Sequence, residues 1–220
     1  MEITLLENDV TKIETDVLVV NLFEGVTSPA GATGAVDKVI GGLITALISD
    51  GEISGSEGEV TLIHTPSSVY PDLKASRVLV AGLGSSDRID TNAIRRVSAT
   101  VIRKLREVGV KKFATIVHGA GIGGTDVSSS AQSLVEGSIL GAYRFLKYRT
   151  TDTKRKPDVE SMVIVESDSS KLAAIGDAIK KGVTYANAEI LARDLVNEPA
   201  NKLSPADLAS VALKVASDNG

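Results

Sequence analysis

The chain lacks cysteine and tryptophan altogether, and its 220 residues include just two histidines, three phenylalanines and four tyrosines. Without cysteine, disulfides and thiolate metal sites are excluded. So few aromatic rings leave little material for stacking on bases or sugars. The formal net charge of -4 also argues against a protein built mainly to hold nucleic acid.

Long hydrophobic runs are missing as well. The longest apolar stretches, such as GGLITALI at 41–48, are far shorter than a membrane-spanning helix. The opening MEITLLENDV carries acids where a signal peptide has a basic region and a long apolar stretch. We therefore expect a cytoplasmic, soluble protein, long enough for one domain with a sizeable core and extra elements.

Short β-branched runs alternate with helical patterns along the chain. Strands are expected at residues 3–6, 17–21, 60–64, 77–81, 113–118 and 162–166. Apolar residues three or four apart predict helices over 34–49, 91–108 and 128–148. This alternation predicts an α/β protein with a mixed, largely parallel sheet flanked by helices. An antiparallel hairpin at the start of the chain would make the sheet mixed.

A long helix is expected from Ser170 onward, and at roughly 27 residues it would measure about 40 Å, more than one small domain needs. Pro199 ends it near Asn197, because the residue before a proline is disfavoured in a helix. Ser204 is a suitable N-cap and Pro205 a suitable first residue for a new helix. The sequence thus predicts a boundary between two structural units.

The run LARDLVNEPANKLSPADLA at 191–209 resembles the junction between the two domains of the leucyl aminopeptidase (cytosol aminopeptidase) family of metallopeptidases. Two earlier runs, VLVAGLG at 78–84 and EGSILGAYRFLKYRT at 136–150, resemble the amino-terminal domain of that family in matching order. The resemblance implies a macro-domain-like fold for residues 1–168, a linker helix and junction at 169–203, and the start of the catalytic domain at 204–220.

In that family, amino-terminal residues are released from peptides by two-metal hydrolysis, and the enzymes are hexamers. The metal ligands lie in the carboxy-terminal domain around a stretch reading NTDAEGR, which this sequence does not contain. The resemblance therefore implies no catalytic and no metal-binding residue in this chain. It implies two divalent ions, zinc or manganese, in a full-length parent, and a non-catalytic role here in packing, homo-oligomer assembly and substrate access.

Two other patterns have a plain structural explanation. His64 and His118 each end an expected strand and lack the spacing of paired metal ligands, which favours a structural role for both. HGAGIGG at 118–124 matches G-x-G-x-x-G, but the acid at the end of the next strand, Glu166, is too distant for a dinucleotide site. A glycine-rich turn is the favoured interpretation.

VVN at 19–21 followed by GATGAVDKVIGG at 31–42 resembles the ADP-ribose-binding loop of macro domains. Helix-start amides at Gly34 and Ala35 could hold a phosphate there. The run from Leu22 to Gly25 departs from the small residues that macro domains use, so we expect a shared fold without a shared ligand. The candidate ligand-loop residues are Asn21, Gly31, Gly34, Gly121 and Gly123.

Two alternatives to an aminopeptidase domain follow from these patterns. One is a free-standing macro-type module that binds ADP-ribose or a nucleotide. The other is a DNA-binding regulator, since some bacterial members of the family bind DNA. Its support is the set of basic residues Arg95, Arg96, Arg103, Lys104, Arg106, Lys147, Arg149, Lys154, Arg155 and Lys156. The negative net charge favours a solvated surface for this set, and no nucleic-acid partner is expected.

Overall fold

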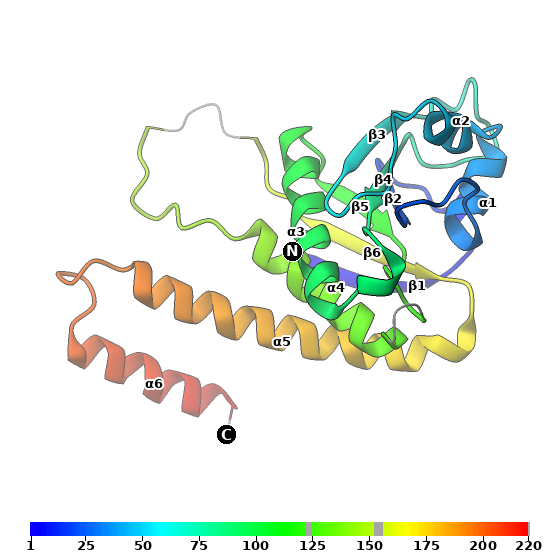
Figure 1. Ribbon diagram of the computed structural model, residues 1–220. Coiled ribbons are helices and arrows are strands. Elements are labelled where there is room, and N and C mark those ends of the chain that lie inside the picture. Colours follow the sequence, from blue (N-terminus) through cyan, green and yellow to red (C-terminus); the bar gives the residue numbers. More distant parts are fainter. Residues whose placement is uncertain (122–124, 152–155, 220) are drawn as a thin grey trace.

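The computed structural model describes residues 1–121, 125–151 and 156–219, and shows one six-stranded sheet covered by helices (Figure 1). The strands follow the order β1-β6-β5-β2-β4-β3. Every neighbouring pair is parallel except β3 and β4. The predicted mixed, largely parallel sheet is therefore confirmed. The strands are β1 (Glu2–Glu7), β2 (Leu18–Leu22), β3 (Val60–His64), β4 (Arg77–Gly82), β5 (Lys112–Thr115) and β6 (Ser161–Glu166).

The predicted hairpin at the start of the chain is wrong. β1 lies at one edge of the sheet, parallel to β6, with Ile3 opposite Met162. β2 is buried on both faces, as expected for a central strand, and it lies between β4 and β5. Both edges of β2 are therefore already paired and cannot bond to β1. The antiparallel pair is instead β3 with β4 at the far edge.

Helices cover both faces of the sheet. Successive strand residues point to opposite faces, so Val17 and Val19 enter one hydrophobic cluster while Leu18 and Val20 enter the other. The first cluster includes side chains of α3, α4 and α5, and the second those of α1 and α2. The helices are α1 (Gly31–Val39), α2 (Leu43–Ser49), α3 (Thr91–Glu107), α4 (Val127–Ala142), α5 (Leu172–Asn197) and α6 (Pro205–Asn219).

The helix expected over 34–49 is two helices, α1 and α2, bent by 104°. Gly41 and Gly42 separate them with φ of 71° and 80°, a conformation that other residues rarely adopt. The buried carboxylate of Asp37 accepts hydrogen bonds from the first amides of α2, those of Ile44 (2.7 Å) and Thr45 (3.2 Å). An apolar stripe alone could not reveal this corner, because the stripe continues across it.

The helix expected over 128–148 also ends early, at Ala142. Phe145 and Leu146, expected on its apolar stripe, belong to an irregular segment that follows it. The long helix from Ser170 is confirmed as α5, preceded by one 3-10 turn at Ser169–Lys171. α6 begins at Pro205, as the capping residues predict.

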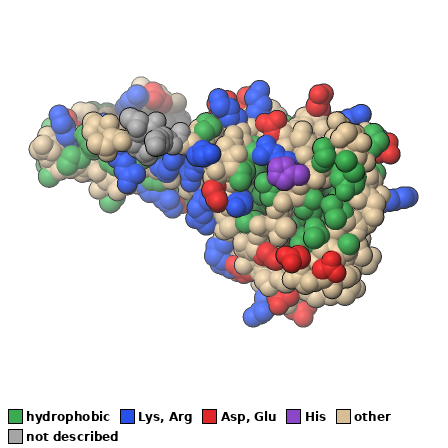
Figure 2. Space-filling model, turned by 90° about the horizontal axis from the view of Figure 1, so that it is seen from above, with side chains coloured by type: hydrophobic (Ala, Val, Ile, Leu, Met, Phe, Trp, Pro, Cys, Tyr) green, Lys and Arg blue, Asp and Glu red, His purple; other side chains and the backbone are tan. Residues whose placement is uncertain are grey.

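α5 packs against α4 and β1 and then extends beyond the body of the domain, where the chain turns and α6 runs back in the opposite direction (Figure 1). Figure 2 shows the resulting shape, a rounded body with a narrow arm. Within the described ranges, no single helix is long and apolar enough to cross a membrane, and the bent pair α1 and α2 reaches that length only when joined.

Candidate functional site

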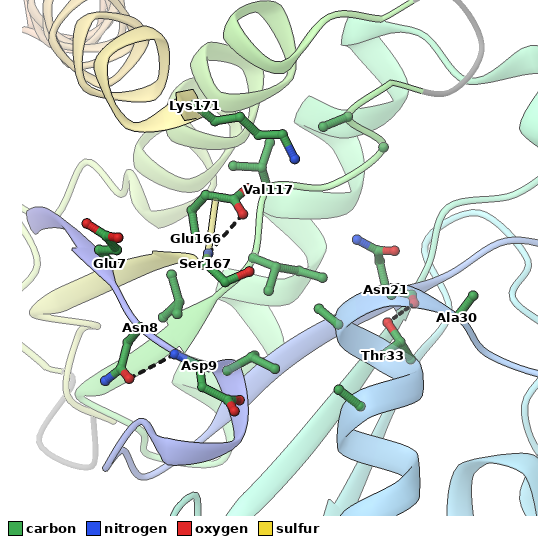
Figure 3. A pocket seen from close by; sticks show the side chains of 18 of the residues that line it. Glu7, Asn8, Asp9, Asn21, Ala30, Thr33, Val117, Glu166, Ser167 and Lys171 are labelled. Carbon is green, nitrogen blue, oxygen red and sulfur yellow. Dashed lines mark hydrogen bonds between the residues drawn. The ribbon is translucent and has the colours of Figure 1, made fainter. Parts of the chain in front are cut away.

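An open pocket of about 970 Å³ lies at the carboxyl ends of the parallel strands (Figure 3). Asn21 comes from the end of β2, Val117 follows β5, Glu166 ends β6 and Glu7 ends β1. The first turn of α1 forms another wall. Ligands of open α/β sheets bind at this edge, so the pocket is the candidate functional site.

The pocket opens where β2 and β5 separate. The two strands pair through Leu18 with Ala114 and Val19 with Thr115, whereas β2 stays paired with β4 as far as Leu22. After β2 the chain enters α1 on one face of the sheet, and after β5 it enters α4 on the other. A crevice between two such strands is a usual ligand position. The separation also explains why β5 ends at Thr115 instead of the expected His118.

The amino end of α1 faces this pocket. Its N-cap residue, Ala30, makes no side-chain capping bond, and the first amides of a helix lack intrahelical partners. The Oγ1 of Thr33 donates to the carbonyl oxygen of Asn21 at 2.7 Å and so ties α1 to the end of β2. This wall is suited to an anionic or carbonyl group of a ligand.

Acidic side chains lie on the opposite side. Figure 3 shows Glu7, Asp9 and Glu166 across the pocket from the start of α1, with Lys171 above them. The backbone amide and hydroxyl of Thr11 donate to Asp9 and hold the pKa of its carboxyl below the usual value, so Asp9 is ionised at neutral pH. A positive helix end facing a negative rim suits a ligand that carries both signs of charge better than a polyphosphate.

His118 joins the segment after β5 to Asn21. Its Nδ1 lies 3.2 Å from the Nδ2 of Asn21, and the ring is 1% exposed. Burial lowers the pKa of the imidazole to about 4, so the ring is neutral at pH 7. The amide of Asn21 can donate to Nδ1 of a neutral ring whose proton is on Nε2. His118 thus holds two strand ends together, whereas His64 is exposed at the end of β3.

Two of the predicted ligand-loop residues, Asn21 and Gly31, line the pocket. Gly34 does not line it, and its amide donates to the carbonyl of Ala30 at 3.1 Å as the first bond of α1. The helix therefore starts one turn earlier than the sequence suggested. The amides without intrahelical partners are therefore those of residues 31–33, which precede Gly34.

The second glycine loop reaches the pocket through Gly119 and Ala120. Gly121 does not line the pocket, and its amide donates to the carbonyl of Thr125 at 2.9 Å. Gly123, the last candidate, lies outside the described residues.

Sequence reasoning missed the charged rim of the pocket, whereas it did indicate Phe23. Phe23 lines the pocket, within the run from Leu22 to Gly25 that departs from macro domains. A usable signal did exist for Glu7 and Glu166, because each ends an expected parallel strand and such ends share one edge of the sheet. Lys171 carries no comparable signal, since it belongs to a short turn before α5.

The basic residues predicted on α3 are mostly engaged with acids. Arg95 pairs with the buried Glu136, which also accepts from Gln132 at 2.7 Å. The other pairs on this helix are Arg96 with Glu57, Lys104 with Glu107, and Arg106 with Asp158. In the second set, Lys147 pairs with Glu198, while Lys154 and Arg155 lie outside the described residues. This pairing gives a DNA-binding surface little support.

Metal-ligating side chains do not gather anywhere in the described part of the chain. Within residues 1–121, 125–151 and 156–219, no group of three or more His, Asp or Glu could hold a metal ion. The carboxylates at the pocket rim belong to separate strand ends and are mostly exposed. These residues do not fit a two-metal centre.

Comparison of the fold with solved structures gives a first classification. A tomato leucine aminopeptidase mutant matches 99% of this chain and 42% of its own, with a TM-score of 0.78 and 23% identity. A Trypanosoma brucei macrodomain in complex with ADP matches 81% of this chain, with a TM-score of 0.58 and 15% identity. The fold is therefore an α/β domain of the type found in leucine aminopeptidases and in a macrodomain.

The sequence gives the family. Residues 19–152 match the model of the cytosol aminopeptidase family, N-terminal domain. A probable cytosol aminopeptidase of Solibacter usitatus is 34% identical over 220 residues. The chain belongs to the cytosol aminopeptidase family. It spans 41% of the length of that relative and 43% of a similar relative from Alkaliphilus oremlandii.

Proposed function

We propose that the chain is the non-catalytic amino-terminal part of a leucyl aminopeptidase-like enzyme that acts in the cytoplasm. Residues 1–168 are the macro-like domain, 169–203 the linker helix and junction, and 204–220 the beginning of the catalytic domain. The complete enzyme releases amino-terminal residues from peptides with two divalent ions, zinc or manganese. The part described packs on the catalytic portion, contributes to a homo-oligomer and shapes access of peptides.

The exposed apolar face of α6 carries this proposal. Leu208 is 49% exposed and Val215 42%, and the two share one face of the helix because they are seven positions apart, while Leu213, on another side, is 72% exposed. A helix of 15 residues is marginal in water unless it packs against something, and exposed apolar faces mark sites of interaction. The relatives are more than twice as long as this chain, and their additional length supplies a packing partner for such a face.

A chimera tests the proposal. The carboxy-terminal portion of the Solibacter usitatus relative is joined after Gly220, and release of leucine from a chromogenic amide is measured with zinc or manganese. We expect activity from the chimera and none from the 220-residue chain. Replacing Leu208 and Val215 by Asp should reduce activity and assembly of the chimera, whereas Lys214→Gln, on the same helix, should not. Metal-dependent release by the chain alone would overturn the proposal.

A macro-type ligand-binding module is the second candidate, supported by the pocket between β2 and β5. We expect no measurable ADP-ribose binding, because Phe23 lines the pocket and the acids of its rim repel a diphosphate. Calorimetry with ADP-ribose decides the matter. Micromolar binding that is lost in Ala32→Glu, a change in the wall of the pocket, and kept in Gly176→Ala would favour this second candidate.

A further inference from the structure

Residues 143–148 follow α4 without regular secondary structure and contact the end of α5, and we call them the strap. A pocket of about 280 Å³ between the two is lined by Arg144, Phe145, Leu146 and Lys147 on one side and by Asp194 and Glu198 on the other. The strap therefore lies beside the last turns of α5 without filling the space completely.

The last two turns of α5, after the partly buried Ile190 that packs against the core, lie outside the hydrophobic core. The buried residues of α5 are Ile175, Ala178, Ile179, Gly182 and Ala186, so the described helix has none after Ala186. Leu191 is 38% exposed and Val196 85%. An isolated helix end of this kind frays or swings unless other contacts hold it. Polar contacts with the strap take this role here.

Tyr143 makes the first set of contacts. Its hydroxyl donates to Oδ1 of Asp194 at 2.8 Å and accepts from Nδ2 of Asn197 at 3.2 Å. The guanidinium of Arg193 lies 5.7 Å from the centre of the same ring, within cation-π range. One side chain of the strap thus contacts three residues in the last two turns of the helix.

Glu198 makes the second set. Its carboxylate accepts from Nζ of Lys147 with one oxygen and from the hydroxyl of Tyr148 with the other. Its side chain is 12% exposed, whereas that of Lys147 is 60% exposed. These two donors hold the pKa of the Glu198 carboxyl below its usual value, so the acceptor is charged at neutral pH.

The beginning of the strap is fixed to the body of the domain. Nη1 of Arg106, on α3, donates to the carbonyl of Ala142 at 3.1 Å. Asp158 pairs with both Arg106 and Arg144. The strap therefore connects α3 at one end with the end of α5 at the other. Figure 2 shows Lys and Arg side chains gathered where the arm joins the body.

We infer that the strap is a clamp that fixes the direction in which α5 leaves the domain, and with it the position of the chain after Pro199. Glu198 directly precedes Pro199, and the amides of Lys202 and Leu203 both donate to the Pro199 carbonyl, at 2.8 and 3.1 Å. Because this turn is tight, the direction of the chain at Glu198 also determines the position of α6. The inference does not depend on the proposed function, because it concerns contacts within this chain.

Spin labels can measure the clamp in the complete 220-residue chain. The chain has no cysteine, so Lys112→Cys and Asn201→Cys place two labels without removing native thiols. Both positions are exposed, one at the start of β5 and one in the turn after Pro199. Pulsed electron–electron double resonance then measures the distribution of distances between the two labels, one on the body of the domain and one in the junction.

Opening the clamp should broaden this distribution. We expect the double variant Tyr143→Phe, Glu198→Gln to at least double the width of the distance distribution. Each single variant should give a width between those of the parent chain and the double variant. Asp177→Asn is the matched control, since it removes a surface ion pair with Lys180 on the same helix but away from the strap, and should leave the width unchanged. Circular dichroism confirms that each variant is folded.

Hydrogen exchange gives a second measurement. The amides of residues 193–198 should exchange at least tenfold faster in the double variant, while those of 175–186 stay as in the parent chain. A distribution as narrow as that of the parent, together with unchanged exchange at 193–198, would overturn the inference.

Discussion

The carboxylate of Asp37, in α1, accepts a hydrogen bond from Oγ1 of Thr45, in α2, at 2.6 Å. The same carboxylate accepts from the backbone amides of Ile44 and Thr45, so a residue of one helix caps the start of the next. Because Asp37 is 8% exposed, these bonds are made where water competes little. They hold the corner that places α1 against the sheet and its amino end at the pocket.

Asp37→Ala should lower the free energy of unfolding by about 2 kcal/mol or more, since it removes a cap and leaves buried amides without an acceptor. Urea unfolding followed by circular dichroism measures the change. Asp50→Ala is the control, because Asp50 is exposed at the other end of α2 and should change stability by less than about 0.5 kcal/mol. Equal effects of the two substitutions would contradict this role of Asp37.

Gly137→Ala should destabilise the domain by about 1–3 kcal/mol, because a Cβ there would lie 2.3 Å from the carbonyl oxygen of Arg95 and force α3 and α4 apart. Gly176→Ala, in α5, meets no atom within 4 Å and should stabilise by about 0.5–1 kcal/mol. Denaturant unfolding of both variants provides the comparison. A neutral Gly137→Ala would mean that the two helices are not in close contact.

His118 should make the domain less stable in mild acid. Its pKa is about 4 in the folded state and near 6.5 when unfolded, so between these values the unfolded chain binds more protons. The stability contribution is complete above pH 6.5 and is lost as the pH falls toward 4. Between pH 7 and pH 5 the loss amounts to about 2 kcal/mol.

The pH effect is checked by unfolding with urea at pH 7 and pH 5. His118→Gln should remove this part of the pH dependence, even if it lowers stability at pH 7. His64→Gln should keep it, since His64 is exposed. If His118→Gln and the parent chain lose stability equally, protonation of His118 is not the cause.

α6 should exchange its amide hydrogens quickly in dilute solution, because none of its described side chains is buried. Hydrogen exchange followed by mass spectrometry compares residues 208–215 with Phe113–Thr115 of β5, which are buried in the sheet. Protection of α6 as strong as that of β5 would place the helix within this domain and move the proposed boundary.

The order of elements was predictable because it depends on local patterns. The run from Val17 to Asn21 is a short β-branched apolar run, and the stripe of α3 carries a strong period-3.6 signal. Pro199 with Ser204 marks the junction. The wrong strand pairing involves contacts between distant residues, whereas the corner between α1 and α2 and the early end of α4 at Ala142 involve neighbouring residues. β1 pairs with β6 across more than 150 positions, and no local pattern shows this partner.

The candidate site was predictable in part for the same reason. Asn21 and Gly31 were found because both belong to one short motif at a strand end and a helix start. Most of the acidic rim comes from the ends of β1 and β6, the first and last strands in sequence, so its position depends on their pairing at one edge of the sheet. The 3.2 Å contact of Asn21 with His118 joins residues 97 positions apart and follows from the crossover, not from the motif.

The length of α5 has a mechanical consequence. At a rise of 1.5 Å per residue, residues 183–197 extend about 22 Å past Gly182, so a tilt of about 10° at that point moves the end of the helix by about 4 Å. The pivot of such a tilt is the close contact of α5 with α4, where a Cβ on Gly182 would lie 2.9 Å from the Cβ of Val135. A substitution that slightly changes the packing at this contact therefore produces a larger displacement at Pro199, far from the substituted residue.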